Sequence, residues 1–425
     1  MAQATLGSAA PPAAKPMVSA TGEPLKVSLA RAERRKRITC FLLVVPLLLF
    51  VIVTFIIPIG DLAMGSVRNP QVVTYLPRTA DAIQEWDGQE LPGEPVFEAL
   101  IEDLRDGRGS PAIGRVGARL NYEKSGMRST MQRAGRAANR LEAPYREALI
   151  ERDDAWGELD TWRIIQRESS PYTLSYFVAA LDMTYDENGN IVRVDEDQRV
   201  YVQLFMRTFW LSVIITVLTL LLGFPIAYLM AHMRARYANL LMILVLLPFW
   251  TSLLVRTSSW IVMLQQQGVL NDILVSLGII DDDGRLLMVY NQTGTIVAMT
   301  HILLPFMVLP LYSIMKTIPP SYVRAARSLG ANQWTAFWRV YVPQTTAGIG
   351  AGGVLVFIIA IGYYITPALV GGQSGQMISN FIAFHMQRSL NWGLAAALGT
   401  ILLVAVMVLY YLYNKLIGVD RLKLG

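Results

Sequence analysis

Long apolar runs constrain this chain more than any other feature of its sequence. The first covers Ile38 to Gly60, and five more follow at residues 208–231, 240–264, 294–314, 347–370 and 395–416. At about 1.5 Å per helical residue, each run is long enough to cross a hydrocarbon core about 30 Å thick. Hydrophobic residues make up 53% of the chain and charged residues only 16%, which excludes an ordinary soluble domain. We therefore expect an all-α membrane protein with six transmembrane helices.

Basic residues gather at alternate ends of these runs. The basic clusters are Arg31 to Arg37, Arg234 with Arg236, Lys316 to Arg339, and Lys415 to Lys423. Because cytoplasmic loops carry an excess of Lys and Arg, this side is predicted to be cytoplasmic, with both termini on it. Residues 61–200 hold most of the 32 acidic residues and fewer than half of the 37 basic ones, and we place them on the opposite side. The first apolar run exceeds the ~7 to 15 residues of a signal peptide, so we expect it to be a retained span.

The same patterns divide the chain into segments. Residues 1–37 begin with an Ala-, Pro-, Ser- and Gly-rich stretch and are predicted to be a disordered cytoplasmic tail. Transmembrane helix 1 occupies 38–60, an external insertion 61–206, and a transmembrane core 207–425 with a cytoplasmic loop at 317–345.

The external insertion is large enough for a small domain. Val96 to Leu104 has the spacing of an amphipathic helix, whereas 125–140 and 145–166 look helical but polar. Asn188-Gly189 between two short β-prone stretches predicts a hairpin. Because much of the insertion is charged, we expect a mainly helical, loosely packed, solvated cap. A docking surface for an extracytoplasmic partner is the alternative.

The cytoplasmic loop predicts two short helices separated by a glycine. Ser321, after Pro319 and Pro320, is an N-cap candidate, and Gly330 stands where a C-cap glycine belongs. The second helix carries an aromatic stripe and is expected to end at Pro343; the stripe consists of Trp334, Phe337, Trp338 and Tyr341. A loop of this kind is suited to contact a partner.

The sequence lacks the residues that ATP hydrolysis, a zinc centre and an internal disulfide each require. No G-x-x-x-x-G-K-[ST] phosphate loop is present, so we expect the chain neither to bind nor to hydrolyse ATP. The three histidines, His232, His301 and His385, are scattered, which argues against a zinc centre. Cys40 is the single cysteine, so no internal disulfide can form. We predict no cofactor and no enzymatic activity for the chain itself.

Polar groups at membrane depth are the remaining functional candidates. Arg256 either snorkels to the outer interface beside Trp260 or lines a translocation path. We assign Trp260, Tyr363, Tyr364 and Asn380 to the same candidate path.

Two further segments bear on the packing of the spans. Gly348 and Gly352 permit either close helix packing or a hinge. Residues 377–392 are short and polar for a span and predict an external or re-entrant helix, or an interfacial one.

One motif in the loop resembles a known family. Ala325-Ala326, Gly330 and the triplet Val340-x-Val342-Pro343 keep the spacing of the E-A-A-x3-G-x9-I-x-L-P loop in permease subunits of binding-protein-dependent ABC importers. Arg324 stands where that family usually has Glu, and valines replace its Ile and Leu. The segments Leu254 to Thr257, Gly371-Gly372 and Asn391-Trp392 resemble permeases of the spermidine/putrescine type.

This resemblance implies a function. It implies the type I ABC importer permease fold in the bacterial inner membrane, with 317–345 as a coupling loop that docks on a cytoplasmic ABC ATPase dimer, where ATP is hydrolysed. Trp334, Phe337 and Trp338 would anchor that contact, with Arg324 at its rim. A second permease subunit and a periplasmic or extracellular solute-binding protein are the other implied partners, and no nucleic acid is expected.

The implied cargo is a small organic solute, either a polyamine or a related cationic or opine-like compound. A ligand-gated channel or sensor that uses the external domain is the alternative function. A sensor would need a cytoplasmic output domain, and the tail from Lys415 is too short for one.

Overall fold

The computed structural model describes residues 25–186 and 188–417, in two compact units, Met1–Leu62 and Ala63–Gly425. In the first unit a long helix runs through α1 (Leu25–Val51), the π-helix η1 (Ile52–Ile56) and into α2 (Ile57–Gly65). Residues Glu33–Gly65 have the length and hydropathy of a membrane span, and they include the first predicted span. The predicted tail at 1–24 lies outside the described residues. For 25–37 the prediction of disorder is wrong, because this stretch lacks Gly and Pro and is rich in good helix formers.

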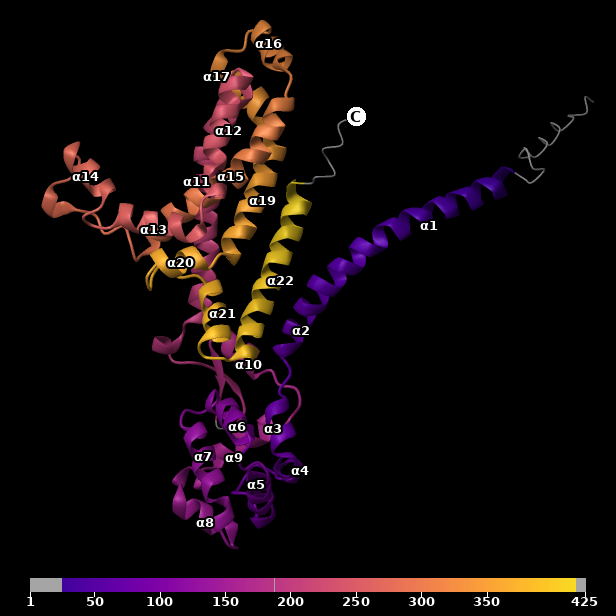
Figure 1. Cartoon of the computed structure of the whole chain (residues 1–425), viewed down its shortest axis with the longest axis vertical. Helices are drawn as coiled ribbons and strands as arrows, with labels where there is room; N and C mark the ends of the chain where they lie inside the picture. Colours follow the sequence, from indigo (N-terminus) through magenta and orange to yellow (C-terminus); the bar gives the residue numbers. More distant parts are fainter. Residues whose placement is uncertain (1–24, 187, 418–425) are drawn as a thin grey trace, which may run out of the picture. The chain divides into compact units, whose positions relative to one another are not determined.

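In the second unit, short helices and 3₁₀ turns form a separate packed layer, here called the α3–α9 domain (Figure 1). Its elements are α3 (Pro70–Tyr75), α4 (Pro77–Gln84), α5 (Glu94–Asp106), α6 (Ala112–Asn121), α7 (Met127–Ala137), η2 (Ala138–Arg140), α8 (Tyr145–Arg152), η3 (Asp154–Gly157) and α9 (Leu159–Glu168). Phe97 and Trp162 are fully buried at its centre, with ring centroids 4.5 Å apart. The expected loosely packed cap is therefore wrong. Buried residues such as Ile83, Val116 and Met131 give α4, α6 and α7 apolar faces that their charged residues hide in the sequence.

The two ends of the α3–α9 domain pair with each other. Asn69 N–H donates to Pro171 O at 2.9 Å, and Thr173 N–H donates to Val67 O at 2.8 Å. The first and last residues of the domain therefore lie side by side.

A buried charged cluster joins this domain to the rest of the unit. Arg119 donates to Asn69 Oδ1 at 2.8 Å and forms an ion pair with the fully buried Glu168. Its guanidinium also lies 4.7 Å from the centroid of the Tyr176 ring, whose other contacts include Gly393 at the start of α22. Burial raises the pKa of Tyr176 to about 12. The cluster therefore ties the inserted domain to the final helix.

Short elements connect the insertion to the long helices. They are α10 (Ser175–Ala180), β1 (Met183–Tyr185), β2 (Ile191–Arg193) and η4 (Glu196–Gln198). The two strands pair antiparallel, which confirms the predicted hairpin.

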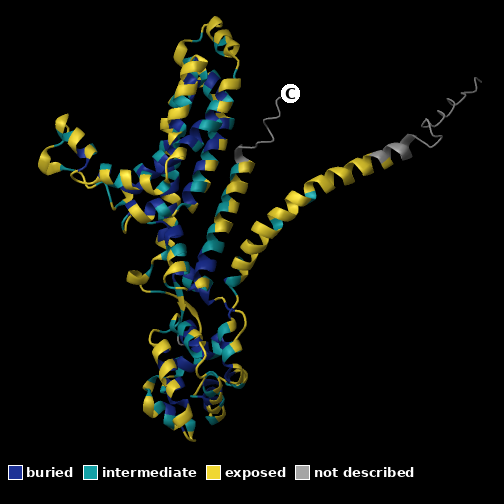
Figure 2. Ribbon diagram, viewed as in Figure 1, coloured by how far each residue is buried: buried dark blue, intermediate teal, exposed yellow. Residues whose placement is uncertain are grey.

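A bundle of long apolar helices forms the remainder. Its elements are α11 (Tyr201–His232), α12 (Ala235–Trp250), α13 (Leu253–Leu264), α14 (Val269–Ser276), η5 (Asp282–Gly284), α15 (Gln292–Thr317), α16 (Pro320–Ser328), α17 (Gln333–Ala336), η6 (Phe337–Tyr341), α18 (Val342–Gln344), α19 (Thr346–Gly362), α20 (Ile365–Val370), α21 (Ile378–Gln387) and α22 (Trp392–Ile417). Among all described residues, four helices are long and apolar enough to span a membrane, and two bent helix pairs raise the number to as many as six. Figure 2 shows buried residues along the inner sides of this bundle.

Two predicted spans are broken rather than continuous. The run at 240–264 divides into α12 and α13 at Thr251 and Ser252, and the chain bends there by 99° between α12 and the segment Leu253–Ser276. The run at 347–370 divides into α19 and α20 at Tyr363 and Tyr364. Pro248 and Pro367 lie near the two breaks, and prolines are a common cause of kinks in helices.

Glycines bring α19 against α15. A Cβ at Gly348 would lie 3.2 Å from Leu311 Cα, and one at Gly352 would lie 2.8 Å from Met307 Sδ. Close packing was one of the two predicted uses of these glycines, and the contacts confirm it.

Candidate functional site

The predicted cytoplasmic loop folds into two short helices joined at Gly330. The first, α16, begins at Pro320 with Pro319 as its N-cap, so the assignment of Ser321 as the cap is wrong. Pro is well placed in a first helical turn because the N–H it lacks has no intrahelical acceptor there. Gly330 has φ +91°, its N–H donates to Arg327 O at 3.0 Å, and Ala331 N–H donates to Ala326 O at 3.1 Å. This is a Schellman cap, and it confirms the predicted glycine terminus.

The second helix continues through Pro343. Asn332 Oδ1 accepts the Thr335 N–H at 2.7 Å and caps α17. The chain then passes through η6 and α18 and bends by 58° at Thr345 into α19. The helical run therefore ends at Gln344, one residue after the predicted end at Pro343.

The predicted aromatic stripe splits into an inner and an outer half. Phe337 packs against Phe224 and Tyr228 of α11, with ring centroids 6.3 and 5.6 Å apart, and the neighbouring Tyr341 is buried. Trp334 and Trp338 remain exposed, at 73% and 58%. Phe337 therefore holds the loop onto α11, and only the two tryptophans are available to a partner.

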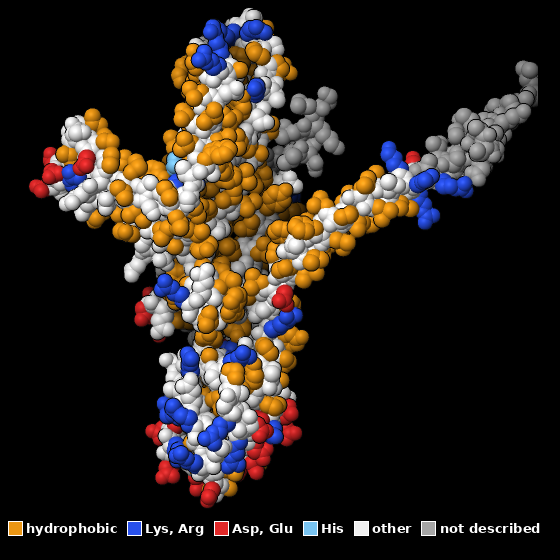
Figure 3. All heavy atoms as spheres, viewed as in Figure 1, with side chains coloured by type: hydrophobic (Ala, Val, Ile, Leu, Met, Phe, Trp, Pro, Cys, Tyr) orange, Lys and Arg blue, Asp and Glu red, His pale blue; other side chains and the backbone are white. Residues whose placement is uncertain are grey.

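An apolar and basic surface lies at this end of the bundle, and we call it the α16–α18 surface. Its exposed residues are Arg324, Ala325, Arg327, Leu329, Trp334, Trp338, Arg339 and Pro343; Ala326, Val340 and Val342 are half-buried beside them. Leu329 is 89% exposed. No acidic residue occurs between 317 and 345, and Figure 3 shows Lys and Arg side chains gathered at this end. Arg324, Trp334 and Trp338 of this surface also line a groove of about 970 Å³ against α11.

The break between α12 and α13 explains the position of Arg256. Its guanidinium donates to Thr251 O at 3.0 Å and to Thr251 Oγ1 at 3.4 Å. Arg256 thus supplies a donor to a carbonyl that the broken helix leaves without its usual partner. This is a capping contact that neither of the two predicted roles included.

The break between α19 and α20 is satisfied in the same way. Ser379 Oγ donates to Tyr363 O at 2.7 Å, and Asn380 Nδ2 donates to Tyr364 O at 2.8 Å. Asn380 Oδ1 also accepts the Met377 N–H at 2.9 Å. The Asn380 amide therefore stabilises the broken helix at the start of α21.

Near these breaks, the predicted path residue Trp260 and three residues that were not assigned to the path, His301, Thr257 and Thr366, make further polar contacts. Trp260 Nε1 donates to His301 Nδ1 at 3.2 Å, which links α13 to α15. The hydroxyls of Thr257 and Thr366 lie 3.4 Å apart and link α13 to α20. Threonines within apolar runs are common in membrane helices, so sequence alone gave no reason to single these out.

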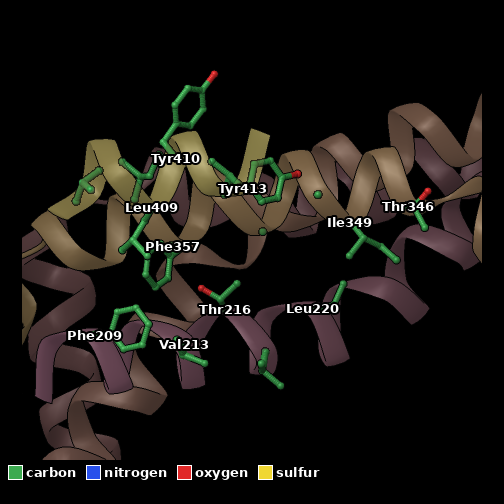
Figure 4. A pocket seen from close by; sticks show the side chains of 16 residues that line it. Phe209, Val213, Thr216, Leu220, Thr346, Ile349, Phe357, Leu409, Tyr410 and Tyr413 are labelled. Atoms are coloured by element: carbon green, nitrogen blue, oxygen red, sulfur yellow. The ribbon is translucent and has the colours of Figure 1, made fainter. Parts of the chain in front are cut away.

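A separate apolar pocket of about 540 Å³ lies between α11, α19 and α22 (Figure 4). Phe209 and Phe357 meet across it with ring centroids 5.8 Å apart. Its lining contains no charged side chain, so a charged solute would lose hydration there without compensation. The pocket is therefore unsuited to an ionic ligand.

Comparison with known proteins places the long helices in a described family. The model of the binding-protein-dependent transport system inner membrane component matches residues 223–418. The spermidine/putrescine transport system permease protein PotB of Haemophilus influenzae is 37% identical over 222 residues, which are 52% of this chain and 77% of that protein. PotB of Escherichia coli is 32% identical over 52% of this chain and 80% of that protein.

Among solved structures, a bacterial alginate ABC transporter in complex with an alginate pentasaccharide-bound periplasmic protein aligns with 54% of this chain and 82% of the matched chain. The identity is 20% and the TM-score is 0.43.

Proposed function

Because the chain belongs to the family of binding-protein-dependent transport system inner membrane components, we propose that it forms, with a second permease subunit, the membrane path for a polyamine or a related organic cation. It is a multi-pass inner-membrane permease subunit of an ABC importer. The observation that carries the cargo proposal is the 37% identity to a spermidine/putrescine permease over 77% of that protein.

In this proposal, a cytoplasmic ATPase dimer docks on the α16–α18 surface. Exposed Trp334, Trp338 and Leu329 are large apolar groups that a small interface can bury as anchors. The Schellman cap at Gly330 fixes the angle between the two short helices and so presents these side chains together. ATP binds to and is hydrolysed by the partner.

The charge of this surface specifies the partner further. Arg324 and Arg327 are exposed on α16, and no acid lies nearby in the sequence to neutralise them. The ATPase groove is therefore proposed to be acidic where it meets Arg324. Arg324→Glu should reduce co-purification of the ATPase, whereas Arg236→Glu, a charge reversal on exposed α12, should leave it unchanged.

The topology completes the proposal. Six spans place both termini in the cytoplasm, with the α3–α9 domain outside, where it could meet the solute-binding protein. The family match begins at residue 223, after this domain, which supports its being an addition to the permease core.

The cargo path has one unusual property. Helices α11 to α13, α15 and α19 to α22 contain no acidic residue, and Arg256 stands at the α12–α13 break. A polyamine would therefore meet aromatic faces such as Trp260, Tyr363 and Tyr364 on this subunit, with carboxylates supplied by the second permease.

The test is reconstitution of the complete transporter in proteoliposomes. Uptake and ATPase stimulation are measured with spermidine, putrescine and a panel of opines. We expect stimulation by a polyamine. Stimulation by opines alone would refute the polyamine cargo while leaving the importer function intact.

A further inference from the structure

A small basic pocket lies in the α3–α9 domain, away from the long apolar helices. It has a volume of about 290 Å³ and is bordered by α7, η2, α8 and η3. Four arginines and one aspartate line it, over a floor of Ala134, Ala137, Leu149 and Trp156; the charged residues are Arg133, Arg136, Arg140, Arg152 and Asp153.

The one acid in this pocket is already paired. Asp153 forms an ion pair with Arg133. Burial acts to raise the pKa of Asp153, but hydrogen bonds from Arg133, Thr130 and the Ala155 N–H outweigh it, so the pKa lies below its usual value. The carboxylate is therefore ionised at neutral pH and is neutralised by Arg133.

The other three arginines keep their charge. Arg136, Arg140 and Arg152 are exposed, and among the described residues none of them forms an ion pair with a carboxylate. They stand together in a stretch of the chain, residues 61–200, that is otherwise rich in acids. Three like charges around one concavity repel each other unless an anion lies between them.

The pocket floor is apolar. Trp156 is fully buried, and its indole N–H has no acceptor among the described residues. That nitrogen is covered by protein atoms, so a ligand in the pocket would contact the ring and not the N–H. The alanines, Leu149 and the Trp156 ring offer apolar contact below the guanidinium groups.

We propose that this pocket, here called the α7–α8 pocket, binds a small organic carboxylate with an apolar body. Guanidinium groups recognise carboxylates through paired, charge-assisted hydrogen bonds. The apolar floor distinguishes such a ligand from a compact inorganic anion, and a volume of about 290 Å³ suits a small molecule. This activity goes beyond solute import and does not depend on the proposed cargo.

Calorimetric titration of the purified full-length chain in nanodiscs at low salt tests the proposal. The probes are benzoate, inorganic phosphate, and benzyl alcohol as the uncharged analogue of benzoate. We expect saturable binding of benzoate, weaker binding of phosphate and none of benzyl alcohol. Absence of benzoate binding, or phosphate binding as tight as benzoate binding, would overturn the proposal.

Variants then locate the site. The double variant Arg136→Gln, Arg152→Gln removes two exposed, unpaired charges and should weaken benzoate binding by about tenfold or more, because a charge-assisted hydrogen bond contributes ~1.5–3 kcal/mol. Arg128→Gln makes the same charge change on α7 at an exposed position outside the pocket and should bind normally. Equal affinities in the two proteins would contradict the assignment.

Discussion

Gly330 offers the sharpest test of how the α16–α18 surface is built. Its φ of +91° lies in the left-handed region, and no atom lies within 4 Å of the position that a Cβ would take. A substitution there meets no steric obstacle within the chain, so its cost arises from the backbone. That cost is about 1 kcal/mol for Ala and similar residues, whereas Asn tolerates the conformation.

A cost of about 1 kcal/mol lowers the equilibrium constant between the capped and the uncapped loop by about fivefold. We therefore expect Gly330→Ala to reduce ATP-driven uptake several-fold in proteoliposomes that contain the partner subunits. Gly330→Asn should retain most of the uptake, and Gly330→Leu should lose the most because it adds bulk on the docking side. ATPase activity and solute uptake are measured in the same vesicles.

The relative uptake of the three variants tests both the coupling role and the backbone explanation. If Gly330→Leu transports at the wild-type rate, the coupling role is wrong. If Gly330→Asn is as defective as Gly330→Ala, the left-handed conformation is not the reason for the defect.

Three further predictions concern packing, charge and the helix break. Gly352→Leu should prevent α19 from packing on α15 and abolish stable assembly in size-exclusion chromatography. Gly362→Leu should assemble, because no atom lies within 4 Å of the position of its Cβ. Assembly of both variants would contradict the role of Gly352 in packing. Arg119→Met removes the buried partner of Glu168 and leaves that carboxylate with the half-buried Arg167, so it should destabilise the α3–α9 domain by ~1–3 kcal/mol in denaturant unfolding. Exposed Arg128→Met is the control, and equal stability of the two would show that the buried pair contributes little. Arg256→Ala should lower uptake without loss of assembly, because Thr251 O loses its hydrogen-bond donor. Arg256→Lys should retain part of the wild-type uptake. Normal uptake by Arg256→Ala would show that Arg256 has no role in the path.

Local sequence signals predicted the structure correctly where a single residue determines the backbone conformation. Gly330 predicted a helix terminus because glycine adopts positive φ at little cost, and Asn188-Gly189 predicted the hairpin for the same reason. The close contact of Gly352 with Met307 likewise follows from the absence of a side chain.

Sequence was insufficient where tertiary contacts decide the outcome. The break at Thr251 lies in an apolar run with no glycine beside it, and it is stabilised by Arg256 from the following helix. Phe337 looked equivalent to its neighbouring tryptophans until α11 was in place against it. The roles of Arg256, Phe337 and Asn380 depend on the backbone group or ring that each side chain contacts. Hydrophobic periodicity in the sequence does not predict those contacts.

The same limit applies to the α3–α9 domain. Its core is assembled from short stretches on many helices, so no single window has a strong apolar face, and Trp156 and Trp162 meet only after folding. Burial of Arg119 with Glu168 was equally hidden, because 49 residues separate the partners.

The central claim, that an ATPase docks on the α16–α18 surface, is tested most directly by photocrosslinking. A photoreactive phenylalanine analogue is placed at Leu329, which is 89% exposed, in cells that produce the complete transporter. A matched site is Leu277, which is 67% exposed after α14 and is proposed to face the outside. We predict an ATPase adduct from position 329 and none from position 277. No adduct at 329, or an adduct at both positions, would contradict the account.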